Sequence, residues 1–171
     1  MAKPQFNLIS GLLAVVAVVV LGSAAYFFTR VPDAPQVTFK TLSDGQITTA
    51  QLKGKVTLVN FWATSCVTCV AEMPKIVETH QKYQAQGYET IAVAMSYDRP
   101  DYVSNFVKSR NLPFKVAVDL DSSIANAFSG VRLTPTTFVI DKKGRIIKQY
   151  LGEPKFAELH TLIEAALKEP A

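Results

Sequence analysis

The chain has 171 residues, enough for one globular domain with a buried core, and its formal net charge is only +4. The first 30 positions hold two basic residues and no acid, so residues 31–171 carry 16 basic and 14 acidic side chains, which gives no indication of nucleic-acid binding. The two cysteines are too few for a disulfide scaffold and, by themselves, for a four-ligand zinc site.

An apolar run from Leu8 to Phe28 contains no charged residue. As a helix, its 21 residues would extend roughly 31 Å, close to the thickness of a bilayer core. Lys3 before the run favours a cytoplasmic N-terminus. We therefore predict a membrane anchor at residues 1–30, with the rest of the chain exported. The small residues Ser23-Ala24-Ala25 also suit a signal-peptide cleavage site, and this alternative exports the same domain.

Residues 31–35 contain two prolines and are predicted to form a short, stiff linker, followed by one domain at residues 36–171. Apolar segments predict strands, and apolar residues three and four positions apart predict helices. The predicted strands are 36–40, 47–52, 56–62, 90–95, 115–118, 137–141 and 145–151, and the predicted helices run from Cys66 to before Gly87 and over 99–110, 122–128 and 155–167. Ser122 is expected to cap the third of these helices.

Apolar positions predict which face of each long helix is buried. These faces are Met73, Ile76, Val77, His80 and Tyr83 in the first helix, Tyr102, Val103, Phe106 and Val107 in the second, and Phe156, Leu159, Ile163 and Leu167 in the last. Strands and helices alternate, and the chain then ends in a hairpin and a helix. This order indicates an α/β fold, a three-layer sandwich with a mixed sheet.

The two cysteines, Cys66 and Cys69, lie between the apolar strand 56–62 and the first helix. Unpaired N–H groups at a helix N-terminus favour an anion, and a thiolate placed there can lower its pKa from about 8.5 to roughly 3.5–7.5. We predict that Cys66 is the exposed attacking thiolate and that Cys69, one turn inside the helix, resolves the mixed disulfide. The alternative is that both are small buried side chains without a redox role.

The stretch Phe61-Trp62-Ala63-x-x-Cys66-x-x-Cys69, continued by Glu72-x-Pro74, resembles the thioredoxin active-site motif. Thr134-Pro135-Thr136, followed by an apolar strand, resembles the Thr-Pro-Thr loop of the same superfamily. Residues 36–167, together with the N-terminal apolar run, are similar to the TlpA/ResA group of exported thiol–disulfide oxidoreductases. The resemblance implies a thioredoxin-like three-layer sandwich with a central mixed β-sheet, a strand–helix insertion at residues 98–118 and an N-terminal transmembrane helix.

The resemblance also implies a set of site residues. Cys66 and Cys69 would form the redox-active disulfide, Glu72 would be catalytic, and Trp62, Thr134 and a cis Pro135 would form the substrate-binding wall. We interpret Trp62 as a core residue as well as part of this wall. Three positions depart from the family pattern, since Ser65, Thr68 and Asn60 replace a tryptophan, a proline and a buried aspartate. Asn60 cannot exchange a proton, so that role would pass to Glu72.

Each of these assignments has a plainer alternative. Glu72 would otherwise be a solvated acid in the first helical turn, which the helix dipole also favours. Pro135 would otherwise be an ordinary trans turn proline. His80 and His160 lie on or beside apolar helix faces, so we interpret them as core or boundary residues and predict no metal site.

The resemblance implies a reductase without a cofactor that acts on protein disulfides. Its targets would be apocytochrome c or a copper-site protein of a terminal oxidase, and its electron donor a membrane thiol reductase of the DsbD/CcdA type. We expect a monomer anchored by one span in the bacterial inner membrane, with its catalytic domain on the periplasmic side. Two alternatives stay open at this point, a disulfide-forming oxidant and a copper-binding chaperone of related fold. The dipeptide Val67-Thr68 between the cysteines does not distinguish the direction of electron flow.

Overall fold

The computed structural model describes residues 11, 15–22, 31–43 and 45–171 of the chain. The chain divides into two units, Met1–Val31 and Pro32–Ala171. Residues 15–22 of the first unit are helical. Among the described residues, no helix is both long enough and apolar enough to cross a membrane, and much of the predicted anchor, residues 1–30, falls outside the described residues.

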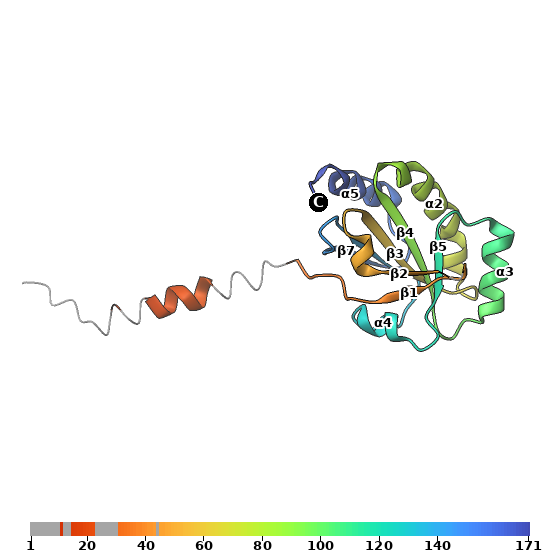
Figure 1. Ribbon diagram of the computed structural model, residues 1–171, viewed down its shortest axis with the longest axis horizontal. Helices are drawn as coiled ribbons and strands as arrows, with labels where there is room; N and C mark the ends of the chain where they lie inside the picture. Colours follow the sequence, from red (N-terminus) through yellow and green to blue (C-terminus); the bar gives the residue numbers. More distant parts are fainter. Residues whose placement is uncertain (1–10, 12–14, 23–30, 44) are drawn as a thin grey trace, which may run out of the picture. The chain divides into compact units, whose positions relative to one another are not determined.

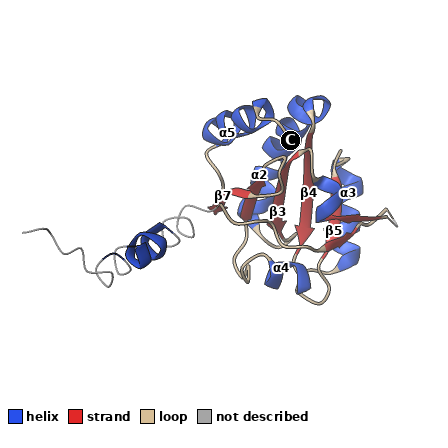
Figure 2. Cartoon of the chain, turned by 60° about the vertical axis from the view of Figure 1, so that its left-hand side comes forward, coloured by secondary structure: helices blue, strands red, loops and turns tan. Residues whose placement is uncertain are grey.

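The second unit is organised around a five-stranded sheet (Figures 1 and 2). Its strands are β3 (Val56–Trp62), β4 (Tyr88–Ala94), β5 (Lys115–Val118), β6 (Thr136–Ile140) and β7 (Ile146–Leu151), in the spatial order β5-β4-β3-β6-β7. Strand β3 pairs in parallel with β4 and antiparallel with β6, so the sheet is mixed, as predicted. Because β3 is central and covered on both faces, all seven of its residues are buried.

Helices and a small hairpin cover the two faces of this sheet. One face carries α2 (Val67–Tyr83), α3 (Pro100–Arg110) and α5 (Phe156–Lys168), and the other carries α4 (Ser123–Ala127) with the hairpin of β1 (Thr38–Lys40) and β2 (Gln46–Thr48). Side chains of β3 alternate between the two cores, with Leu58 and Trp62 on the α2 side and Val59 and Phe61 on the α4 side. The α/β three-layer sandwich is therefore confirmed, and the alternation directs Asn60 toward α2.

The predicted faces of α2 and α5 are largely correct. Of the predicted residues, the buried ones are Met73, Ile76, His80 and Tyr83 in α2 and Leu159 and Ile163 in α5, while Val77, Phe156 and Leu167 are partly buried. Ala166, which was not predicted, is also buried. In α3 the prediction fails at Tyr102, whose side chain is 53% exposed. Its ring lies 4.6 Å from the Arg99 guanidinium. The other predicted residues of this face pack in the core, with Val103 buried and Phe106 and Val107 partly buried.

The predicted strand 47–52 is wrong in its second half. Residues 46–48 form β2, but Thr49–Leu52 form a 3₁₀ helix, η1. A reciprocal capping box starts this helix, because Thr48 N donates to Gln51 Oε1 over 2.8 Å and Gln51 N donates to Thr48 Oγ1 over 3.3 Å. The polar side chains of Thr48 and Gln51 therefore determine the local structure in place of the apolar pattern.

The predicted capping role of Ser122 is also wrong. Ser122 has a left-handed backbone with φ 60°, and its side chain makes no capping hydrogen bond. Asp119 caps α4 instead, since its carboxylate accepts hydrogen bonds from Ile124 N over 3.0 Å and from Ala125 N over 2.8 Å.

Part of the segment predicted as a linker, residues 31–35, pairs with the turn between β6 and β7. Ala34 is buried, and its N–H donates to Gly144 O over 2.8 Å. Ile146 N donates to Pro32 O, also over 2.8 Å. The backbone of residues 32–34 is thus attached to the domain as an additional edge segment.

Candidate active site

The chain passes from β3 into α2 at Cys66, as the sequence predicted. Cys66 has an extended backbone and occupies the N-cap position of α2. Its Sγ accepts a hydrogen bond from Cys69 N over 3.2 Å, so one of the unpaired N–H groups of the first helical turn points at this sulfur. The first turn of α2 contains no acidic residue. Once the cysteine is reduced, a helix N-terminus of this kind favours a negative charge on its sulfur.

Cys66 and Cys69 form a disulfide, with their Cα atoms 5.2 Å apart. The alternative of two free, buried cysteines is therefore wrong. Cys66 is partly exposed, whereas Cys69 has no exposed surface. Only the Cys66 sulfur is accessible to an incoming thiol or disulfide.

Glu72 lies inside the protein, three residues after Cys69 on α2. Its side chain is 0% exposed, which excludes the alternative of a solvated first-turn acid. Burial raises the pKa of Glu72 to about 7, partly offset by the hydrogen bond that its Oε1 accepts from Asn60 Nδ2 over 3.0 Å. Its Oε2 has no hydrogen-bond partner among the described residues. Because residues three apart on a helix are neighbours, a carboxyl group that titrates near neutral pH lies beside the buried Cys69.

Asn60 connects two elements beneath the disulfide. Its Nδ2 donates to Glu72 on α2 and also, over 2.9 Å, to Thr137 Oγ1 on β6. Thr137 is the register partner of Asn60 in the β3–β6 ladder, so their side chains lie on the same face of the sheet. The amide therefore holds the carboxyl group of Glu72 in place without competing for its proton.

The Thr134–Pro135 peptide bond is cis, as the resemblance implied. In the antiparallel pairing of β3 and β6, Thr136 lies opposite Phe61, so the residues just before Thr136 run beside the end of β3. Thr134 and Pro135 therefore lie at the edge of the sheet from which the chain continues to Cys66. Thr134 Oγ1 lies 3.2 Å from the hydroxyl oxygen of Tyr97.

Trp62 is positioned below the site. It is 0% exposed, and its ring lies 5.1 Å from that of Phe106 on α3. We predicted it as both active-site wall and core; because it has no exposed surface, it is a core residue that supports the end of β3 and contacts α3. Its large apolar area stabilises the segment from which the Cys66 loop starts.

Two polar residues near the disulfide were missed by sequence reasoning. The carboxylate of Asp98 is only 7% exposed and accepts hydrogen bonds from both N and Oγ1 of Thr64, each over 2.6 Å. Asp98 follows β4, and β4 runs parallel to β3. Neighbouring parallel strands end at the same edge of a sheet. The acid just after the predicted strand 90–95 could therefore have been expected to lie near the end of β3.

A groove of about 530 Å³ opens next to the segment that precedes Cys66. It is lined by Thr64, Ser65, Tyr102, Asn105, Phe106 and Ser109. One wall is therefore the loop before the attacking cysteine, and the other is a face of α3. Val67, the residue after Cys66, is 84% exposed, so the surface around the accessible sulfur is open to a macromolecule.

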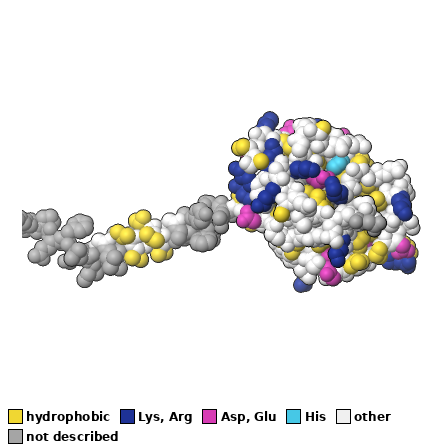
Figure 3. Space-filling model, viewed as in Figure 1, with side chains coloured by type: hydrophobic (Ala, Val, Ile, Leu, Met, Phe, Trp, Pro, Cys, Tyr) yellow, Lys and Arg dark blue, Asp and Glu magenta, His cyan; other side chains and the backbone are white. Residues whose placement is uncertain are grey.

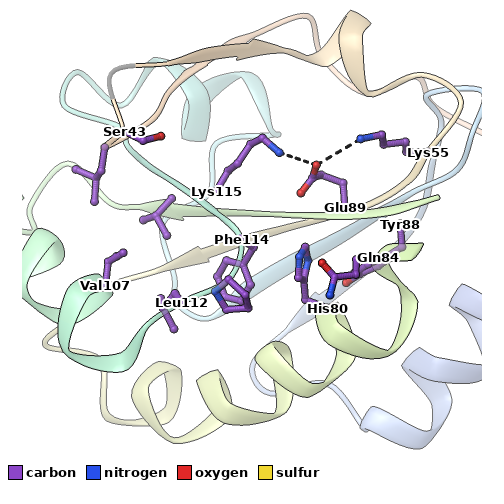
Figure 4. Close-up of a pocket in the computed structure, with 13 residues that line it drawn as sticks. Ser43, Lys55, His80, Gln84, Tyr88, Glu89, Val107, Leu112, Phe114 and Lys115 are labelled. Carbon is purple, nitrogen blue, oxygen red and sulfur yellow. Dashed lines mark hydrogen bonds and ion pairs between the residues drawn. The ribbon is translucent and has the colours of Figure 1, made fainter. Parts of the chain in front are cut away.

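A separate pocket of about 580 Å³ lies at the other end of β3 and β4 (Figure 4). There Glu89 is held by Lys115, 2.7 Å away, and by Lys55, 3.6 Å away. His80 Nδ1 lies 3.2 Å from Thr90 Oγ1, and burial lowers the pKa of His80. His80 is thus a core residue, as predicted. Within the described parts of the chain, no three His, Cys, Asp or Glu side chains come together in a way that could hold a metal ion.

One face of the domain is mixed in character. The face visible in Figure 3 carries Lys and Arg together with Asp and Glu, and its hydrophobic side chains occur in small groups.

Comparison with known proteins agrees with this site. The Redoxin family matches residues 31–163. The thiol-disulfide oxidoreductase ResA of Bacillus thuringiensis (strain Al Hakam) is 39% identical over 122 residues, which cover 71% of this chain and 69% of ResA. The ResA protein of Bacillus subtilis (strain 168) is 32% identical over 128 residues, covering 75% and 70% of the two chains.

Two solved structures share the fold. The solution structure of a protein from Neisseria meningitidis described as a thioredoxin has a TM-score of 0.75 and 40% identity, covering 81% of this chain and 92% of that one. A thiol:disulfide interchange protein of the thioredoxin family from Chlorobium tepidum has a TM-score of 0.74 and 27% identity, covering 81% and 98%. With its Cys66–Cys69 disulfide at the start of α2 and its cis Pro135, the chain belongs to the Redoxin family and is a thioredoxin-like thiol–disulfide oxidoreductase of the TlpA/ResA type.

Proposed function

We propose that this oxidoreductase works as a reductant of protein disulfides on the outer side of a bacterial cytoplasmic membrane. The observation that carries the proposal is Glu72, a fully buried acid beside Cys69 whose pKa is raised to about 7. A dithiol becomes an oxidant when its reduced form is stabilised as a thiolate. A carboxyl group that becomes negative near neutral pH disfavours a neighbouring thiolate, so it makes the dithiol more reducing.

The proposed reaction transfers two electrons to the target. The Cys66 thiolate attacks one sulfur of the target disulfide, forms a mixed disulfide and releases the first target thiolate. Cys69 then gives its proton to the Glu72 carboxylate, and its sulfur attacks Cys66 Sγ. The second target thiolate leaves and takes up a proton from solvent, and the Cys66–Cys69 disulfide found in the structure is the product.

The location rests on the N-terminal sequence. The run from Leu8 to Phe28 has the length and the lack of charge of a single membrane span. An anchor of this kind would hold the domain at high effective concentration near a membrane donor of the DsbD/CcdA type. Membrane fractionation of the full-length chain, followed by protease digestion of intact spheroplasts, tests this. The expected outcome is a membrane-bound chain whose domain is digested from outside, and recovery of a shortened, soluble chain would contradict the anchor.

The proposed targets are the Cys-x-x-Cys-His segment of apocytochrome c and the cysteine pair of a terminal-oxidase copper site. The TlpA/ResA resemblance supports this target class, and the groove beside Ser65 offers room for a polypeptide next to Cys66. Rates of reduction are to be compared for oxidised peptides of both kinds and for a scrambled peptide with the same cysteine spacing. Equal rates for all three peptides would contradict target recognition while leaving the reductase chemistry intact.

The direction of electron flow is tested by the midpoint potential of the Cys66–Cys69 couple in full-length protein. A reductant is expected to lie below about −220 mV at neutral pH, whereas a value near −120 mV would identify a disulfide-forming oxidant. At pH values above 7, Glu72→Gln is expected to have a higher (less negative) midpoint potential than the wild type, because the variant lacks the negative charge beside the sulfurs. An unchanged midpoint potential in the variant would show that Glu72 does not make the dithiol more reducing.

A further inference from the structure

The loop from Met95 to Arg99, which we call the β4–α3 loop, contacts both segments of the active site. It follows β4, whose last residue Ala94 lies opposite Trp62, the last residue of β3. Its contacts are Met95 N to Trp62 O at 3.0 Å, Ser96 Oγ to Ser122 Oγ at 2.6 Å, Tyr97 OH to Thr134 Oγ1 at 3.2 Å, and Asp98 to Thr64 at 2.6 Å. Consecutive residues of one short loop therefore reach three different segments: residues 62–64 before Cys66, the residue before α4, and the residue before Pro135.

The Asp98 contact fixes the segment before the attacking cysteine. Thr64 lies two residues before Cys66 and donates both its backbone N–H and its hydroxyl to the Asp98 carboxylate. Both bonds are short and charge-assisted, and the carboxylate is nearly buried, so they restrict the backbone of Thr64 strongly. Asp98 itself is held by its N–H, which donates to Met95 O over 2.9 Å.

The Tyr97 contact reaches the segment on the other side of the site. The Tyr97 side chain is 59% exposed, and its hydroxyl lies within hydrogen-bond distance of Thr134 Oγ1. Thr134 directly precedes the cis Pro135. Tyr97 therefore lies on the surface, where an incoming polypeptide would meet the segment around Pro135.

We propose that the β4–α3 loop is a brace that sets the Cys66 segment and the Thr134–Pro135 segment relative to each other. Asp98 and Tyr97 are its two positioning residues. Asp98 acts through Thr64 on the approach of the Cys66 sulfur to any disulfide. Tyr97 acts through Thr134 on the docking of polypeptide targets alone. The inference requires thiol–disulfide exchange at Cys66 but holds for either direction of electron flow.

The test compares Asp98→Asn, Thr64→Val, Thr64→Ser and Tyr97→Phe in the full chain, with a small aromatic disulfide and an oxidised protein as substrates. Asp98→Asn and Thr64→Val are expected to lower kcat roughly tenfold with both substrates and to leave KM unchanged, because a misplaced sulfur slows the chemical step. Thr64→Ser keeps the hydroxyl and is expected to match the wild type. The double variant Thr64→Val/Asp98→Asn is expected to be little slower than the slower single variant.

Tyr97→Phe is expected to raise KM for the protein substrate about threefold or more and to leave the small disulfide unaffected. Glu158→Gln is the matched control, since Glu158 is an exposed acid on α5 paired with Lys148, and neither residue belongs to the β4–α3 loop or to the two segments that the loop contacts. Thermal unfolding of each variant identifies losses that come from misfolding. If Asp98→Asn does not fold, Thr64→Val and Tyr97→Phe still decide the question.

Three results would overturn the brace. The first is additive losses in the Thr64→Val/Asp98→Asn double variant, because the two residues would then act separately. The second is a Tyr97→Phe effect that is equal for both substrates. The third is that the wild type reduces both substrates normally and every variant has the same kcat and KM as the wild type. That result would contradict the brace but not the redox function. A wild-type chain in which Cys66 and Cys69 do not cycle would overturn both proposals.

Discussion

Oε1 of Glu72 accepts a hydrogen bond of 3.0 Å from Nδ2 of Asn60, across the contact between α2 and β3. The amide supplies a donor but no exchangeable proton, so the carboxyl group remains the only titrating member of the pair. Its Oε2 has no partner among the described residues, and its pKa is raised to about 7 by burial. This arrangement leads to predictions about stability, proton transfer and trapping of targets.

The stability of the oxidised protein should fall as the pH rises from about 4.5 to 7. In the unfolded chain Glu72 ionises near its ordinary pKa of 4.5, whereas in the folded protein it holds its proton up to about 7. The folded state therefore binds more protons in this window, and the difference of about 2.5 pKa units corresponds to about 3 kcal/mol. Urea unfolding at a series of pH values measures this change.

Glu72→Gln provides the control for that measurement. The variant should lose this part of the pH dependence and unfold at higher urea concentration than the wild type above pH 7. If its stability falls with pH as steeply as that of the wild type, another group is responsible for the slope.

Removing the Asn60 amide should raise the pKa of Glu72 further. In Asn60→Ala the carboxylate loses its only hydrogen-bond donor among the described residues, and burial then acts on the pKa without that offset. We expect a pKa above 7 by carbon NMR titration and a loss of about 1–3 kcal/mol in unfolding free energy. Thr137→Val removes the other partner of Asn60 and should change the pKa less. A lower pKa in Asn60→Ala would contradict this account.

Cys69→Ser should trap targets on Cys66. The partly exposed Cys66 can still attack a target disulfide, but no second thiol is present to release the mixed disulfide. Mass spectrometry after incubation with an oxidised protein is expected to detect a covalent adduct in Cys69→Ser and none in Cys66→Ser. An adduct formed through Cys69 in the Cys66→Ser variant would reverse the assigned order of attack, against the complete burial of Cys69.

Asp119→Ala should destabilise the domain without changing its redox chemistry. The Asp119 carboxylate caps α4 through two backbone N–H groups, and loss of such a cap costs about 1–2 kcal/mol. Ser122→Ala removes a hydroxyl that contacts Ser96 but caps nothing, so it should cost less. Urea unfolding ranks the two variants, and the midpoint potential of Asp119→Ala should equal that of the wild type. A larger loss of unfolding free energy in Ser122→Ala than in Asp119→Ala would indicate that Ser122, and not Asp119, caps α4.

The sequence alone was sufficient to predict most of the strands and helices and the position of the cysteines between β3 and α2. Val56–Trp62 is a continuous apolar run, apolar residues after Cys66 recur every three or four positions, and Gly87 ends that helical pattern. A pattern of this kind lies within a short window of sequence, so it predicts an element without knowledge of the fold. It failed at Thr49–Leu52 and at Tyr102, where a capping box and a stacked guanidinium determined the local structure.

Only the tertiary structure decided which polar groups meet at the site. Asn60 lies 12 positions from Glu72 and 77 from Thr137, and Thr64 lies 34 from Asp98. No periodicity links residues so far apart, because the sheet pairing and the helix that covers it bring them together. The charge state of Glu72 follows from the same cause. A carboxyl group on the first turns of a helix titrates normally in water, and it titrates near pH 7 here because the fold removes water from around it.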